Sequence, residues 1–372
     1  MSKRMTASDP VRLVKKTMLL GTGLLALWIG GMALAMPGEA LQASLRGLAV
    51  WWEVLFPALF PFFVLSELLL GFGVVHLTGT LLDPLMRPLF RIPGVGGFVV
   101  AMGFASGYPV GARLTSRLME QRLVNREEGE RLVAMTTSSD PIFLIGAVCI
   151  GFFGRADIAP VMAAAHYGGA MLLGLALRGR GRTAEAGKPE ASGASSPVLP
   201  EGGGRMRRAL AAMHRARLAD GRPFGVMLQD ALESSIRLMI VVGGLVVFFS
   251  VALELLLHSG ILSALRSGLG AVLGAIGLVP GLAEAVVQGS FEVTLGSRAA
   301  AEAAKTAPLI DQVAAGAFVL SWAGLSVHAQ VAGLMSRTSW RYLPFLRARL
   351  LHAAFAVGLI YLLWPLLGPH GG

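Results

Sequence analysis

The sequence predicts an all-α protein that crosses a membrane several times and consists of two related halves. Three observations lead to this fold class. Of the 372 residues, 54% are hydrophobic and 15% are charged, whereas a soluble domain usually carries about a quarter charged residues. The mean hydropathy is +0.66, and apolar runs near the length of a membrane helix recur along the chain. The third observation is an internal repeat of these runs and of the polar residues that interrupt them.

Several function classes are disfavoured by the composition. The net charge of +10 does not indicate nucleic-acid binding, because the basic residues stand in short segments between apolar runs, where they set membrane orientation. The single cysteine, Cys149, permits no disulfide or cysteine-based metal site within one chain. Walker A, GxSxG, HExxH and EF-hand motifs are absent, and the histidines and carboxylates lack metal-ligand spacing. We therefore expect no enzyme activity, cofactor or metal.

Residues 1–40 are predicted to form a basic leader and a first membrane helix. The apolar run Thr17–Met36 is long enough to span a bilayer. The segment Ala33–Ala35 also resembles a signal-peptidase site, so that retention and cleavage of this helix both stay open. In either case the chain after Met36 begins on the outer side of the membrane.

Residues 41–177 and 223–366 are predicted to be the two repeats. "LQASLRGLAVWWEVLFPALFPFFVLSELLLGFG" begins at Leu41, and the similar "LQDALESSIRLMIVVGGLVVFFSVALELLLHSG" begins at Leu228. At nearly the same offset Gly111 pairs with Gly296, and His166 pairs with His352. Residues 178–222 between the repeats are rich in Gly, Ala, Ser and Arg and predict a flexible basic linker whose later part is a short surface helix. Residues 367–372 form a tail.

Within the first repeat, the length and polarity of each apolar run indicate its course. Leu48–Gly71, Leu132–Phe153 and Ala159–Leu177 are predicted to cross the membrane, and two prolines should kink the first of them. Val74–Phe90 contains charged residues and prolines and is predicted to lie at the interface. Pro93–Arg117 is interrupted by "SGYPVG". If this interruption is the tip of a re-entrant hairpin, each repeat has three crossings and the second repeat is inverted.

The distribution of lysine and arginine supports the hairpin. This topology places the N-terminus, the linker, the Arg87–Arg131 region and the Arg337–Arg349 loop in the cytoplasm, and these segments contain most of the basic residues. The outer segments contain only Arg46, Arg155, Arg266, Arg298 and Lys305. Cytoplasmic segments of membrane proteins carry such an excess of positive charge. Two full crossings at "SGYPVG" would place the linker outside, so we expect a cytoplasmic linker and an external C-terminus.

Four polar interruptions in matching positions of the two repeats form the candidate site. Broken helices persist in a bilayer only where they are buried in protein or line a cavity, and paired broken helices in inverted repeats indicate a transporter site. Freed N–H groups can bind anionic or hydroxyl groups, and freed carbonyls can bind a cation or a sugar hydroxyl. We predict that a solute contacts Ser106, Gly107, Tyr108 and Gly111 of the first hairpin; Thr137, Ser138, Ser139 and Asp140 of the first broken helix; Gln288, Ser290, Glu292 and Thr294 of the second hairpin; and Ser326, His328 and Gln330 of the second broken helix.

Some of these residues also have a simpler structural interpretation. Asp140, followed by proline, fits the N-cap of a half-helix, and the small hydroxyl residues before it fit helix packing. Glu292 could form an ion pair with Arg298 at the outer surface. His328 fits a hydrogen-bonded core histidine. These alternatives stay open from the sequence alone.

Four more residues recur in equivalent positions, and two interpretations of them stay open. Glu67 and Glu254 lie in the first crossing of each repeat, and His166 and His352 lie near the start of the last one. Carboxylates within a bilayer are costly and usually face a cavity or a partner. The pairs are predicted either to be structural partners, with the glutamates contacting backbone or the histidines, or to take part in ion coupling.

Four segments together resemble a known family: "GFASGYPVGARLTSRL", "ERLVAMTTSSDPIFLIGAV", "GSFEVTLGS" and "SWAGLSVHAQV". They resemble the YlbJ-like sporulation integral membrane proteins of endospore-forming bacteria, which carry nucleoside-recognition (Gate) domains. The resemblance extends from about Leu41 to Leu363. It implies a distant likeness to concentrative nucleoside transporters, in which two re-entrant hairpins and two unwound helices surround a substrate. It also implies a role in spore cortex or coat formation, in mother-cell or forespore membranes.

The sequence therefore predicts a multi-pass sporulation protein of the cell membrane that binds and transports a small polar solute. Its partners would be the lipid bilayer and that solute, with no nucleic acid, and a homo-oligomer is compatible with the sequence. The alternative is a non-transporting membrane scaffold or assembly factor for sporulation. Neither the solute nor a coupling ion can be named from these residues.

Overall fold

The computed structural model describes residues 21–369, apart from residues 22, 25, 180–203 and 304–306. Every regular element in this part of the chain is a helix. The predicted leader, the centre of the predicted linker and the last residues of the tail lie outside the described residues. Lys305, which we assigned to an outer segment, lies outside them as well.

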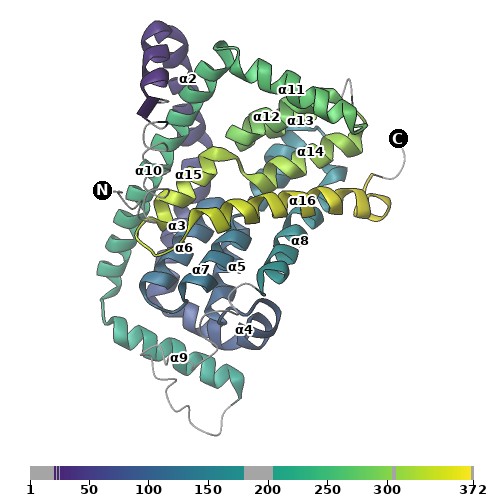
Figure 1. The fold of residues 1–372 in the computed structure, drawn as a ribbon. Coiled ribbons are helices and arrows are strands. Elements are labelled where there is room, and N and C mark those ends of the chain that lie inside the picture. The colour runs from purple at the N-terminus through teal and green to yellow at the C-terminus, as the bar shows by residue number, and fades with distance from the viewer. Residues whose placement is uncertain (1–20, 22, 25, 180–203, 304–306, 370–372) are drawn as a thin grey trace, which may run out of the picture.

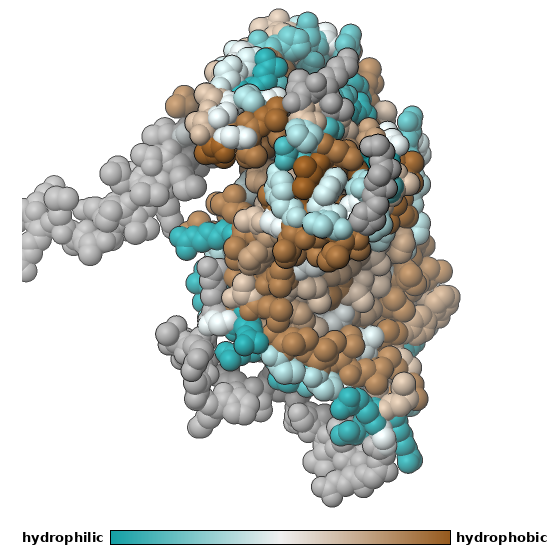
Figure 2. All heavy atoms as spheres, turned by 90° about the vertical axis from the view of Figure 1, so that its right-hand side faces the viewer, coloured by the Kyte–Doolittle hydropathy of each residue, from teal (hydrophilic) through white to brown (hydrophobic). Residues whose placement is uncertain are grey.

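The helices confirm the predicted class of an all-α multi-pass membrane protein. Four are long and apolar enough to cross a membrane: Ala156–Leu177, Phe224–His258, Leu309–Met335 and Tyr342–Leu367. The bent pair Leu59–Gly71 and Val74–Phe90 provides a fifth if it counts as one span. Figure 2 shows a mainly apolar surface across the middle of one face, with hydrophilic residues gathered toward its two ends.

The first half begins with a helical rod made of α2 (Pro37–Ala49), a π-helical segment (Val50–Leu55) and α3 (Phe56–Gly71). The wide π turns lie directly before Pro57 and Pro61, where the missing proline N–H groups prevent regular α-helical bonding. Gly73 ends the rod at φ +76°, a backbone conformation that favours glycine. The chain then turns by 82° into α4 (Val74–Phe90).

The remainder of the first half contains two interrupted elements. Helices α5 (Val95–Ser106) and α6 (Tyr108–Glu120) form a hairpin that reverses at Gly107. Helix α7 (Arg126–Thr136) begins with a capping box between Asn125 and Glu128, and a π-helical segment (Ile142–Phe152) follows after a gap. The predicted crossing Leu132–Phe153 is therefore two short helices, neither of which has the length of a span. Helix α8 (Ala159–Leu177) completes this half.

In the second half a long helix is followed by a shorter one, two pairs of short helices and a final long helix, as in the first half; Figure 1 labels these helices. A basic surface helix, α9 (Arg205–Asp220), comes first and packs against α4. The helices that follow are α10 (Phe224–His258), α11 (Ile261–Ala275), α12 (Ala283–Phe291), α13 (Val293–Glu302), α14 (Leu309–Trp322), α15 (Gly324–Met335) and α16 (Tyr342–Leu367).

The two halves interpenetrate. Helix α16 packs against α8, and α10 packs against both α2 and α3. The Trp51 indole of the first half donates a 2.9 Å hydrogen bond to the Met239 carbonyl of α10, and Trp51 lies where a side chain at Gly243 would stand. One buried cluster contains residues of α6, α7 and α8 together with residues of α13 to α16. The broken helices of both halves therefore lie in one common core.

Candidate functional site

The first hairpin is docked on the first broken helix by direct backbone packing. A Cβ atom on Gly111 would lie 2.6 Å from the Thr136 carbonyl oxygen, and one on Gly103 would lie 3.1 Å from the same oxygen. Gly107, at the tip, has φ +89°, and a Cβ there would lie 3.1 Å from Asp140 Oδ2. Glycine is therefore needed at Gly111, where a Cβ would clash with backbone, and at Gly107, where φ is positive. A Cβ at Gly103 would require its neighbours to shift.

The first break, Thr137–Asp140, interrupts the helix between α7 and the π-helical segment. Asp140 Oδ1 accepts a 2.9 Å hydrogen bond from the Phe143 N–H, so the carboxylate caps the second half-helix. The hydroxyl of Thr137 donates back to the Val133 carbonyl at 2.6 Å. The threonine and both serines of this break are fully buried. The structural interpretation of Asp140 as an N-cap is therefore correct, and its second oxygen faces the tip of the hairpin.

His166 connects the two broken helices to each other. Its Nε2 lies 3.0 Å from the Ser139 N–H and 2.8 Å from the Ser138 hydroxyl. Because Nε2 must accept from a backbone N–H, the ring proton resides on Nδ1, and Nδ1 donates to the Ser321 hydroxyl at 3.0 Å. Ser321 belongs to the last turn of α14. One buried imidazole thus holds the break of one half against the helix end of the other.

His352 lies beside His166, with ring centroids 5.2 Å apart. Its Nδ1 accepts a 2.9 Å hydrogen bond from Arg349, and its Nε2 donates to the His166 carbonyl at 2.9 Å. These two histidines, paired by the repeat in the sequence, therefore meet in space where α8 packs against α16.

Arg349 is a central residue that we assigned wrongly from the sequence. We placed it in a cytoplasmic loop, but it lies within α16 and its side chain is fully buried. It donates to the Ala134 carbonyl at 3.0 Å and also to the Ser321 carbonyl. Two sequence features could have revealed it: Arg349 begins an apolar run, and it stands three residues before His352, on the same helix face.

The second hairpin lies on the second break in the same way. Ala323 and Gly324 interrupt the helix with φ +73° and +70°, and a Cβ on Gly324 would lie 2.9 Å from the Phe291 carbonyl oxygen at the hairpin tip. Glu292 caps α13 by accepting from the Leu295 N–H at 2.8 Å, and it also accepts from the Thr294 hydroxyl at 3.0 Å. The alternative ion pair of Glu292 with Arg298 is not found, and the Arg298 guanidinium lies over the ring of Phe152.

Of the other predicted residues, some connect elements of the core and some hydrogen-bond only locally. Tyr108 donates to the Leu320 carbonyl at 2.9 Å, so the first hairpin also contacts the end of α14. His328 is a hydrogen-bonded core histidine, held by the Tyr342 hydroxyl and the Trp322 carbonyl. Ser326 and Gln330 are buried on α15. The side chains of two residues of the second hairpin donate only within α12, Ser290 to the Val286 carbonyl and Gln288 to Glu284. The Ser290 carbonyl accepts from the Trp322 indole of α14 at 3.2 Å.

Glu67 and Glu254 lie apart from the histidines. Glu67 accepts from Arg113 at 3.2 Å and from Arg117 at 3.4 Å, which ties α3 to the second arm of the first hairpin. Glu254 pairs with Arg46 at 2.7 Å, which ties α10 to α2. The predicted contact of these carboxylates with His166 or His352 is therefore not found. A sequence repeat identifies equivalent positions, but it does not identify the partners that a carboxylate finds in another helix.

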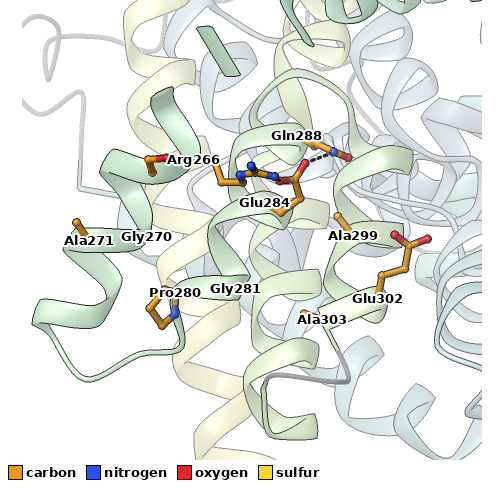
Figure 3. Close-up of a pocket in the computed structure, with 11 residues that line it drawn as sticks. Arg266, Gly270, Ala271, Pro280, Gly281, Glu284, Gln288, Ala299, Glu302 and Ala303 are labelled. Carbon is orange, nitrogen blue, oxygen red and sulfur yellow. Dashed lines mark hydrogen bonds and ion pairs between the residues drawn. The ribbon is translucent and has the colours of Figure 1, made fainter. Parts of the chain in front are cut away.

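Two cavities in the described part of the chain are lined by polar residues away from both breaks. The larger, of 880 Å³, is open and lies between α11, α12 and α13, where Arg266 and Gln288 each contact Glu284 (Figure 3). The smaller, of 150 Å³, is lined by Glu67, Arg117, Asp220, Arg222 and Asp230. There the hydrogen bonds from Arg222 lower the pKa of the Asp220 carboxyl. Gln288 is the only predicted solute-contacting residue that lines either cavity.

The hairpin tips, at Gly107 and Phe291, rest on the two breaks, at Thr137–Asp140 and Ala323–Gly324, and we call this region the junction. It is closed, but not every buried polar atom in it has a hydrogen-bond partner. Within the described residues, the Ser106 hydroxyl at the end of α5 is buried and has no hydrogen-bond partner. Arg349 Nε is likewise buried and unpaired. Buried polar atoms are nearly always hydrogen-bonded, so these two mark positions where a further polar group would be favourable.

The chain is similar to a known protein family and to a curated protein. A family model described as "Nucleoside recognition" (Gate) matches residues 52–156, which include the first hairpin and the first broken helix. The sporulation integral membrane protein YlbJ of Bacillus subtilis (strain 168) is 42% identical over 341 residues, covering 91% of this chain and 81% of that protein. No solved structure matches the fold.

Proposed function

Since this chain belongs to the family of the sporulation integral membrane protein YlbJ, we propose that it binds a small polar solute and carries it across a membrane during sporulation. The solute would occupy the junction between the two hairpin tips and the two breaks. The observation that carries the proposal is the contact of each tip with the break of its own half, at Gly107 with Asp140 and at Phe291 with Gly324. Non-helical backbone at membrane depth is tolerated only where it is buried in protein or lines a cavity, and paired breaks in two halves are typical of transporter sites.

The movement that admits the solute would be a separation of a hairpin from its break. This separation would uncover Asp140 Oδ2 and the buried hydroxyl of Ser106, which has no partner in the described structure. A solute with hydroxyl or other polar groups would hydrogen-bond with both. Half-helix ends paired across two repeats are the arrangement by which transporters hold polar solutes near the midplane.

Inverted repeats and alternating access belong to this proposal. The matched element order supports the repeat, and the basic cytoplasmic segments support the inversion. A reporter enzyme fused at Gly193, in the linker, is expected to report the cytoplasm. The same reporter fused at Gly372 is expected to report the outside, because an odd number of crossings separates the two positions. The same side for both fusions would contradict the inverted topology.

Solute binding is tested by thermal stabilisation of the purified protein with nucleosides, cell-wall precursors and dicarboxylates. We expect one class to raise Tm, since a ligand that binds only the folded state stabilises it by mass action. Asp140→Asn keeps an N-cap acceptor but removes the charge, and it should lose most of that Tm increase. Asp157→Asn, in an exposed pair with Arg155, should retain it. Full retention by the Asp140 variant would remove Asp140 from the site.

A second function, that of a non-transporting scaffold, is favoured by one observation. The polar groups of both breaks are largely satisfied by the protein itself, through Asp140, His166 and Arg349. In a scaffold that retained the fold, the hairpins would stay in contact with their breaks at all times. Uptake of the stabilising solute into proteoliposomes distinguishes the two functions, because a scaffold would leave uptake equal to that of empty vesicles.

A further inference from the structure

We propose that Arg349 is a tethered cation, whose guanidinium fills a cation site formed by the carbonyl ends of both broken helices. The inference concerns the closed junction itself and holds whether or not the protein transports a solute. In this view the positive charge beside the two helix ends comes from a side chain of α16 and not from a free cation.

The two carbonyls that bind Arg349 lie at the C-terminal ends of two helices. Helix α7 makes its last backbone bond from Thr137 N–H to the Val133 carbonyl, at 3.1 Å. The next carbonyl, that of Ala134, accepts from Arg349 Nη1 at 3.0 Å. In α14 the last such bond runs from Ala323 N–H to the Val319 carbonyl, and the Ser321 carbonyl beyond it accepts from Arg349 Nη2. Both ligands are therefore carbonyls that a helix end leaves without a partner.

The two helix ends also suit a cation electrostatically. The C-terminal end of a helix carries a partial negative charge from its aligned peptide dipoles. Two such ends, one from each half of the chain, converge on the same guanidinium. Carbonyls of unwound helices bind monovalent cations in other membrane proteins, so these two ends have the chemistry of a cation site. Arginine is suited to it because its charge is permanent and its donors are fixed in a plane.

The Arg349 guanidinium lacks an anionic partner in the described part of the chain. Among the ion pairs between described residues, none involves Arg349. Its remaining partner is the neutral ring nitrogen Nδ1 of His352. An isolated buried charge costs several kcal/mol or more, so the two helix ends must supply most of its stabilisation. The position equivalent to Arg349 in the first half, in the register of the two histidines, is Ala163. One arginine thus serves both breaks.

The inference is tested by chemical rescue. Arg349→Ala should lower Tm in detergent, and guanidinium chloride at a low millimolar concentration should restore most of the loss by occupying the vacated site. Choline chloride at the same concentration should not restore it, and guanidinium should not raise the Tm of the wild type. Arg347→Ala, at an exposed position two residues earlier on the same helix, is the matched control and should show neither effect.

A second comparison keeps the test decisive if Arg349→Ala does not fold. Arg349→Lys retains a cation, and Arg349→Met retains the bulk without charge. We expect Lys to keep folded protein at a higher Tm than Met. The proposal is overturned if Met is as stable as the wild type or as Lys, because a buried arginine held only for packing is replaceable by a hydrophobic residue. It is also overturned if a folded Arg349→Ala gains no Tm from guanidinium.

Discussion

A His166→Leu variant is expected to lose about 2–6 kcal/mol of the free energy of unfolding, because two buried polar groups lose their histidine partner. The imidazole serves three buried groups: the hydroxyls of Ser138 and Ser321 and the N–H of Ser139. Leucine has a similar volume, but it leaves the Ser139 N–H and the Ser321 hydroxyl without their histidine partner, while the Ser138 hydroxyl keeps a 3.4 Å hydrogen bond to the Ser139 carbonyl. Each buried group left unsatisfied costs about 1–3 kcal/mol. Thermal unfolding of the purified protein, followed by tryptophan fluorescence, measures the loss.

The control for this variant is His258→Leu, because His258 lies at the exposed C-terminal end of α10. Its Tm should stay near that of the wild type. If the His166 variant unfolded at the same temperature as this control, the histidine would not hold the two broken helices together, and the cross-half connection would have to reside elsewhere.

Gly111→Val is expected to separate the first hairpin from its break. The added Cβ would stand 2.6 Å from the Thr136 carbonyl oxygen and 2.9 Å from Thr136 Cβ, and neither the backbone nor a fully buried side chain can yield easily. Overpacking of this kind costs about 1–3 kcal/mol. The displaced hairpin should also abolish the thermal stabilisation that a solute confers on the wild type, because one wall of the site is then misplaced.

The matched control is Gly333→Val on α15, where no atom lies within 4 Å of the added Cβ. It introduces the same β-branched residue into a helix and carries the same loss of helix propensity. Only the Gly111 variant should lose both stability and solute response. Equal behaviour of the two variants would show that the close packing of the hairpin on Thr136 has no functional consequence.

The interruptions of the helices could be read from the sequence because they depend on local chemistry. "SGYPVG" places a glycine, which can adopt a positive φ, two residues before a proline, which favours the first turn of a helix. The structure reverses the chain at Gly107, and Pro109 lies in the first turn of α6. Asp140 before Pro141 is a local start signal for a helix, and the carboxylate is the N-cap. The sequence repeat aligned His166 with His352, and the structure brings their rings to 5.2 Å, although the alignment alone did not predict that contact.

The partners of charged side chains could not be read in the same way. Arg349 stands in a sequence of alternating basic and apolar residues that suits a cytoplasmic loop equally well, and its burial depends on the ends of α7 and α14, far away in the chain. Glu67 lies in an apolar run, yet its partners Arg113 and Arg117 come from the hairpin. Such pairings depend on how helices pack in three dimensions, which hydrophobic periodicity does not record.

The most direct measurement is a cryo-electron microscopy map of the protein with the solute that stabilises it most. We expect solute density enclosed by Gly107, Asp140, Phe291 and Gly324, with at least one hairpin tip moved away from its break. Density confined to the open cavity beside Glu284, with both tips still resting on their breaks, would contradict this expectation.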